Sequence, residues 1–168
     1  MASFQRIRHV YVRSLRFTVM IFAAITGVSI MFMVLLTCAD VVLRLFGNPI
    51  IGAYDLVGVA GAVSMSCALP YTTALKGHVA IEYFFQKLNR TWRIIVDTVV
   101  RLMGIGLFSM LARESARIGT NLKIRGEVTP TLQLPVYWVS WVIALACALV
   151  VLVIIYNMLN PGKELLQP

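Results

Sequence analysis

The sequence contains few of the residues that form redox or metal sites in membranes. Its only histidines, His9 and His78, lie outside the long apolar runs, whereas a transmembrane haem needs axial ligands inside the helix bundle. The three cysteines form no CxxC pair, so neither a thiol-exchange loop nor a zinc site is predicted. HExxH, GxSxG and Walker-type motifs are also missing. We therefore expect no catalytic residue, no metal site and no cofactor, and we do not expect an enzyme.

Charged residues are scarce as well, at 13% of the 168 residues, while 60% are hydrophobic. A soluble domain is charged at about a quarter of its positions, and a chain of this length has too little interior to bury so much apolar surface. The surrounding solvent is therefore expected to be lipid. Lys and Arg number 15 against 7 Asp and Glu, but these cations flank the apolar runs, where they anchor helices among lipid headgroups. No nucleic-acid partner is predicted.

Four apolar runs are long enough to cross a bilayer, which takes about 20 helical residues. They predict transmembrane helices over residues 17–39, 56–75, 94–112 and 135–159. The first helix should continue to Arg44 and stop at Gly47-Asn48-Pro49, because glycine allows a left-handed cap and proline cannot continue a helix. The predicted fold class is an all-α integral membrane protein with four transmembrane helices, in which residues 1–168 form one membrane domain.

The segments between these runs carry further structure. Residues 79–92 place polar and apolar side chains on opposite sides of a helix, which predicts a short amphipathic helix lying in the interface. Residues 113–134 are the one long polar stretch, and the glycines and prolines from Gly119 onward predict a bent, semi-rigid loop rather than a continuous helix. Within the second run, small residues stand four apart and predict a helix-packing stripe: Gly58, Ala62 and Ser66.

The distribution of cations predicts the orientation. Four spans place both termini on the same side of the membrane. More Lys and Arg residues lie on that side, in the N-terminal segment, in residues 76–93 and at Lys163, than in the loops on the other side. Because cytoplasmic loops carry the excess of positive charge, both termini are expected to be cytoplasmic.

Two carboxylate–arginine couples lie in or beside the predicted spans. Asp40 with Arg44, and Asp97 with Arg101, are each four residues apart with the acid first, a spacing that puts both side chains on one helix face. Ionisable groups near lipid are costly, so they either pair or face a polar path for ions or substrate. We favour structural pairs, because each charge has a ready partner. We also expect Arg44 to bridge Asp40 and Asp55 across the turn between the first two helices.

Three segments, in this order along the chain, carry a family resemblance. The first runs from Asp40 to Leu56, the second is Gly77-His78-Val79 followed by an acid, and the third runs from Gly126-Glu127-Val128-Thr129-Pro130 into Leu134-Pro135-Val136-Tyr137-Trp138. Together with the length and the four spans, this order resembles the DctQ-type small membrane subunits of TRAP (tripartite ATP-independent periplasmic) transporters. The resemblance covers most of the chain.

The resemblance implies partners that the bare sequence does not. Subunits of this family lie beside a large membrane subunit of the DctM type, which carries the substrate and sodium sites and moves in an elevator-like way. A periplasmic substrate-binding protein of the DctP type delivers the substrate, typically an organic acid. The small subunit is then a scaffold in the bacterial inner membrane. This implication accords with the missing catalytic motifs.

The polar stretch before the last span offers a docking site for such a binding protein. Its charged residues are Lys123, Arg125 and Glu127, and charges at the rim of an interface mainly set the rate of encounter. The other interpretation of these cations, that they only bind lipid headgroups, stays open. A self-sufficient small transporter or exporter acting as a homo-oligomer also stays open, although residues 17–39 lack the lone acid that small multidrug exporters carry in their first helix.

Overall fold

The computed structural model describes residues 2–75 and 90–159, with side chains from Arg13 onward except those of residues 90–95, 97 and 159. The described part is helical, with one isolated β-bridge. Its helices are α1 (Ala2–Leu45), α2 (Ala53–Ala74), α4 (Arg90–Arg125) and α5 (Tyr137–Leu159). The all-α prediction is therefore confirmed for these residues.

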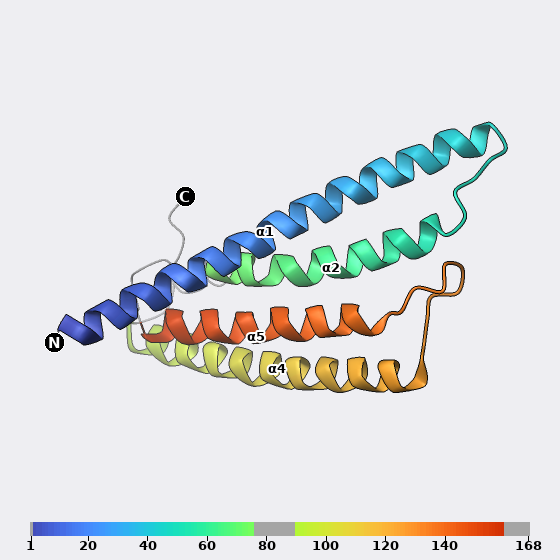
Figure 1. Cartoon of the computed structure of the whole chain (residues 1–168). Helices are drawn as coiled ribbons and strands as arrows, with labels where there is room; N and C mark the ends of the chain where they lie inside the picture. The colour runs from blue at the N-terminus through green and yellow to red at the C-terminus, as the bar shows by residue number, and fades with distance from the viewer. Residues whose placement is uncertain (1, 76–89, 160–168) are drawn as a thin grey trace.

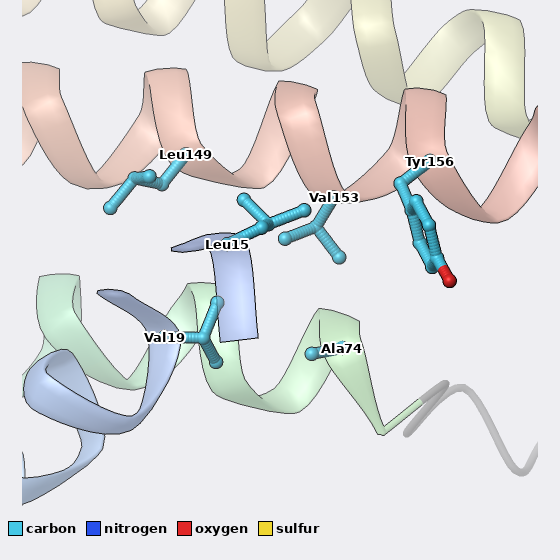
Figure 2. Close-up of a cluster of buried hydrophobic side chains, with 6 residues drawn as sticks. All are labelled: Leu15, Val19, Ala74, Leu149, Val153 and Tyr156. Atoms are coloured by element: carbon cyan, nitrogen blue, oxygen red, sulfur yellow. The ribbon is translucent and has the colours of Figure 1, made fainter. Parts of the chain in front are cut away.

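The helices pack side by side in the order α1, α2, α5, α4 (Figure 1), with contacts between each neighbouring pair. A buried apolar cluster joins α1, α2 and α5 at the end of the bundle that holds the N-terminus (Figure 1). Figure 2 shows its members: Leu15, Val19, Ala74, Leu149, Val153 and Tyr156. Val19, Ala74 and Val153 are fully buried, so this end is closely packed.

Many large apolar side chains on α1 and α4 face outward, because these helices form the two outer layers. Phe17 and Val28 of α1 are 68% and 71% exposed, and Met103 and Met110 of α4 are 69% and 72% exposed. Soluble monomers rarely expose contiguous apolar surface on this scale. In lipid or against another membrane subunit, the same apolar surface is not exposed to water and carries no hydrophobic free-energy penalty. These faces therefore agree with a membrane protein.

Three helices are long and apolar enough to cross a membrane, judged over the described residues. They are Arg13–Leu45, Ala53–Ala74 and Tyr137–Met158, which match three of the predicted spans. The remaining predicted span, residues 94–112, lies inside α4, several of whose first side chains lie outside the described residues. The count of four spans and the cytoplasmic termini therefore stay predictions.

The predicted end of the first helix is confirmed. The last helical residue of α1 is Leu45, and Gly47 has a φ of +79°. The N–H of Gly47 donates to the carbonyl of Arg44 at 3.1 Å, and the N–H of Asn48 donates to that of Leu43 at 3.0 Å. This is the Schellman arrangement, which satisfies carbonyls that a helix end would leave unpaired.

The predicted loop over residues 119–134 is wrong in its first part, because α4 continues as one helix to Arg125. Leaving the apolar core of a bilayer does not end a helix; a chain of good helix formers continues until a stop signal appears. Here that signal is Gly126, with a φ of +65°. The predicted interfacial helix, residues 79–92, lies outside the described residues except for 90–92, which begin α4.

Candidate functional site

The candidate site is the end of the bundle farthest from the N-terminus, here named the loop end. It consists of the α1–α2 turn, residues 46–52, and the α4–α5 hairpin, residues 126–136. Figure 1 shows the hairpin reaching past α5 toward the start of α2. Six of the predicted site residues lie in these loops or in the helix ends beside them: Asp40, Arg44, Asp55, Lys123, Arg125 and Glu127.

The hairpin has a defined internal structure. Gly126 caps α4, with its N–H 3.4 Å from the carbonyl oxygen of Lys123, and a β-bridge pairs Val128 with Pro135. The buried Thr129 closes the tip, because its N–H donates to the carbonyl of Leu134 at 2.9 Å and its hydroxyl accepts the N–H of Leu134 at 3.0 Å. The tip is therefore folded by its own main chain together with the hydroxyl of Thr129.

Asp55 connects this hairpin to α2. It lies in the first turn of α2 and is only 7% exposed. Its Oδ2 atom accepts the N–H of Thr131 at 2.9 Å and the N–H of Leu132 at 3.0 Å. Beside it, the side chain of Leu132 lies directly over Gly52, where a Cβ atom would collide with it. These contacts join segments of the chain that are more than seventy residues apart.

Asp40 and Arg44 form an ion pair at the end of α1. The guanidinium Nη2 of Arg44 lies 2.9 Å from Oδ2 of Asp40, and Oδ1 of Asp40 accepts the N–H of Ile50 at 2.9 Å. The carboxylate thus fixes the α1–α2 turn, while the side chain of Arg44 is 69% exposed. The predicted bridge from Arg44 to Asp55 is wrong, because no ion pair of the described residues joins the two; Oδ2 of Asp55 instead accepts two main-chain N–H groups of the hairpin.

An open pocket of about 320 Å³ lies between the end of α1 and the start of α2. It is lined by Thr37, Asp40, Arg44, Ile50, Gly52, Ala53, Tyr54, Val57 and Thr131. Within the part of the chain that the structure describes, no group of three or more His, Cys, Asp or Glu residues is placed to hold a metal ion.

The predicted docking residues are placed together but already have contacts within the chain. The ammonium group of Lys123 lies 5.9 Å and 5.4 Å from the ring centroids of Tyr137 and Trp141, distances at which cation–π attraction acts. Arg125 and Glu127 lie 3.5 Å apart and are 71% and 49% exposed. The loop end therefore presents the Arg125–Glu127 pair more freely than it presents Lys123.

The remaining predicted residues lie away from the loop end or outside the description. Arg101 is half-buried on α4 and has an interaction partner, but the side chain of Asp97 lies outside the described residues. That pair stays a prediction.

The predicted small-residue stripe also stays a prediction. A Cβ atom at Gly58 would meet nothing within 4 Å, whereas Ser66 is buried and its hydroxyl donates to the carbonyl of Ala62 at 2.7 Å. The close approach of α1 to α2 falls at other small residues. A Cβ atom at Gly61 would lie 3.6 Å from Met33, and the hydroxyl of Thr26 donates to the carbonyl of Ser64 at 3.4 Å.

The fold and the site define a class of protein: a helical membrane protein in which hydrogen bonds join the hairpin between α4 and α5 to the start of α2. The family profile described as tripartite ATP-independent periplasmic transporters, DctQ component, matches residues 33–163, well over half of the chain. The chain belongs to this family, and it is a small membrane subunit of a TRAP transporter. No curated protein sequence and no solved structure gives a significant match. The resemblance of the three sequence segments is thus confirmed.

Proposed function

We propose that this chain is a scaffold subunit in the bacterial inner membrane that supports a large DctM-type subunit during the import of an organic acid, coupled to sodium. Its membership of the DctQ family carries the proposal. One structural observation supports the scaffold role. Among the side chains that the structure describes, Asp55 is the only buried acidic or basic one, and its Oδ2 atom accepts hydrogen bonds from main-chain N–H groups. A substrate or ion path would instead leave such a group available.

The outer layers of the bundle suit a scaffold. The exposed apolar faces of α1 and α4 can contact the large subunit on one side and membrane lipid on the other. The Asp40–Arg44 pair then acts as a structural link at the end of α1, and we assign the same role to Asp97–Arg101. Neither pair needs to touch the transported acid.

The loop end is the proposed docking region for a DctP-type periplasmic binding protein. Arg44, Arg125 and Glu127 are exposed there, and exposed charges at a rim steer the encounter with a partner more than they add affinity. In this proposal the loop end faces the periplasm, both termini are cytoplasmic and four helices cross the membrane.

Cysteine labelling tests this orientation. In a variant without the native cysteines Cys38, Cys67 and Cys147, Thr131→Cys should react with a membrane-impermeant thiol reagent in intact cells, because residue 131 is exposed at the loop end. Ser3→Cys should react only after the cells are opened. The reverse pattern would show that the loop end faces the cytoplasm.

Reconstitution tests the scaffold proposal against a self-sufficient transporter. Liposomes that contain this subunit alone, with an inward sodium gradient, should take up no organic acid. Uptake should appear when the large subunit is incorporated and a loaded binding protein is added outside. A matched sample with the large subunit and binding protein but without this chain should be inactive or strongly impaired. Uptake by this chain alone would contradict the scaffold role.

A further inference from the structure

We infer that Asp55 is a positioning residue, which holds the tip of the 126–136 hairpin on the start of α2 so that the loop end meets the binding protein as a preformed surface. The inference rests on the proposed docking role of the loop end. From the sequence alone, Asp55 is expected to pair with Arg44 instead.

The first support is the environment of the carboxylate. A buried carboxylate is stable only when its charge is satisfied by hydrogen bonds or a cation. Asp55 is 7% exposed and takes part in none of the ion pairs of the described residues. Its Oδ2 atom instead accepts two hairpin N–H groups, from Thr131 and Leu132, and hydrogen bonds to an ionised acceptor are among the stronger ones. The buried charge is therefore matched to the hairpin tip.

The second support is the apolar contact beside it. Leu132 donates its N–H to Asp55 and places its side chain over Gly52, which is buried and has a φ of +83°. The tip is thus held at two points, one polar and one apolar, on the residues that begin α2. With the tip closed internally through Thr129, little freedom is left for it to move relative to the α1–α2 turn.

The third support is that the other loop is fixed in the same way. Asp40 accepts the N–H of Ile50, as Asp55 accepts those of the hairpin. Two carboxylates, one at the end of α1 and one at the start of α2, therefore join the turn, the hairpin and both helices into one surface. Without Asp55 the hairpin would sample several positions, only some of which can bind the partner. The apparent dissociation constant then rises by the inverse of the fraction of molecules whose hairpin is in a binding-competent position.

The experiment compares Asp55→Ala with Asp55→Asn in the complex with the large subunit. Alanine removes the Oδ2 atom that accepts both N–H groups, whereas the amide oxygen of asparagine can still accept both in the same place. The position of the hairpin is read from the distance distribution between spin labels at Ile51→Cys and Pro130→Cys, in a variant without native cysteines. We expect a narrow distribution in the parent and in Asp55→Asn, and a clearly broader one in Asp55→Ala.

The functional readout separates positioning from folding. With binding protein as the varied component, Asp55→Ala should raise the apparent KM for loaded binding protein roughly tenfold, corresponding to a competent fraction near one tenth. The maximal uptake rate per assembled complex should stay close to that of the parent. Asp55→Asn should restore most of the KM. Glu114→Ala serves as the control, since that carboxylate contacts only the exposed Arg117, at 3.7 Å, among the contacts of the described side chains.

The possible results separate the positioning role of Asp55 from the docking role of the loop end. An unchanged distance distribution in Asp55→Ala would overturn the positioning role and leave the docking proposal standing. A broader distribution with an unchanged KM would show that the binding protein docks elsewhere. A fall in maximal rate at constant KM would mean that Asp55 only stabilises the fold. If Asp55→Ala does not assemble, Leu132→Ala loosens the same tip and should give the same broadening and a raised KM, while normal values would contradict the inference.

Discussion

Replacing Gly119 with valine is expected to separate α4 from α5 at the loop end and to abolish most of the assembled transporter. A Cβ atom at residue 119 would collide with Cδ1 of Trp141, and it would lie 2.6 Å from Nε1 of the same ring and 3.2 Å from Cβ of Ser140. The indole is 42% exposed, but moving it away would break its edge-on contact with Tyr137, at 5.5 Å between centroids, and its contact with Lys123. Forcing extra groups into such a contact costs about 1–3 kcal/mol or more.

The matched control for this variant is Gly106→Val. Gly106 lies in the same helix, but a Cβ atom there would meet nothing within 4 Å. Valine at an open helical position should be neutral or slightly stabilising, since glycine is the poorer helix former by a few tenths of a kcal/mol. The measurements are the apparent melting temperature of the purified subunit and its yield in complex with the large subunit. Equal values for the two variants would show that α4 and α5 do not meet at Gly119.

The sequence predicts the helices well because their signals are local. Apolar runs of sufficient length set three of the spans, and the Gly47-Asn48-Pro49 stop places the end of α1 within a few residues of the observed Leu45. The error in α4 has the same origin. Hydropathy reports where the chain leaves lipid, whereas the helix itself continues through polar residues to Gly126.

Partners distant in the sequence are harder to predict. The i,i+4 spacing predicts that Asp40 and Arg44 can meet, and they do. No local pattern indicates that Asp55 binds the main chain of Thr131 and Leu132, because an N–H donor has no residue-specific signature.

The contacts of Gly119 and Gly52 are also with partners distant in the sequence, and they are equally hard to predict. Both glycines are needed by side chains that approach from elsewhere in the chain, Trp141 and Leu132. The sequence shows that glycine stands at each of these positions, but it does not show which side chain approaches it. The loop end is therefore the region where the structure adds most to the sequence.

Alanine at Gly52 is expected to release the hairpin from α2, whereas alanine at Gly47 should have a much smaller effect. Both glycines have left-handed backbones, with φ values of +83° and +79°, so both substitutions carry a similar backbone cost of about 1–2 kcal/mol. The difference lies in the surroundings. A methyl group at Gly47 meets nothing within 4 Å, whereas one at Gly52 collides with Cγ of Leu132 and lies 2.7 Å from both of its methyl carbons.

Limited proteolysis can measure this release, because the exposed Arg125 precedes the hairpin and offers a trypsin site next to Gly126. Cleavage after Arg125 should be several-fold faster in Gly52→Ala than in Gly47→Ala, since proteolysis follows the population of the opened state. Adding Leu132→Ala to Gly52→Ala removes the colliding side chain, but it also removes the apolar contact. The double variant should therefore recover only part of the protection, because the N–H groups of Thr131 and Leu132 can return to Asp55. Equal cleavage of the two single variants would mean that the Leu132 contact does not hold the hairpin, and that the backbone conformation of each glycine alone sets the cost.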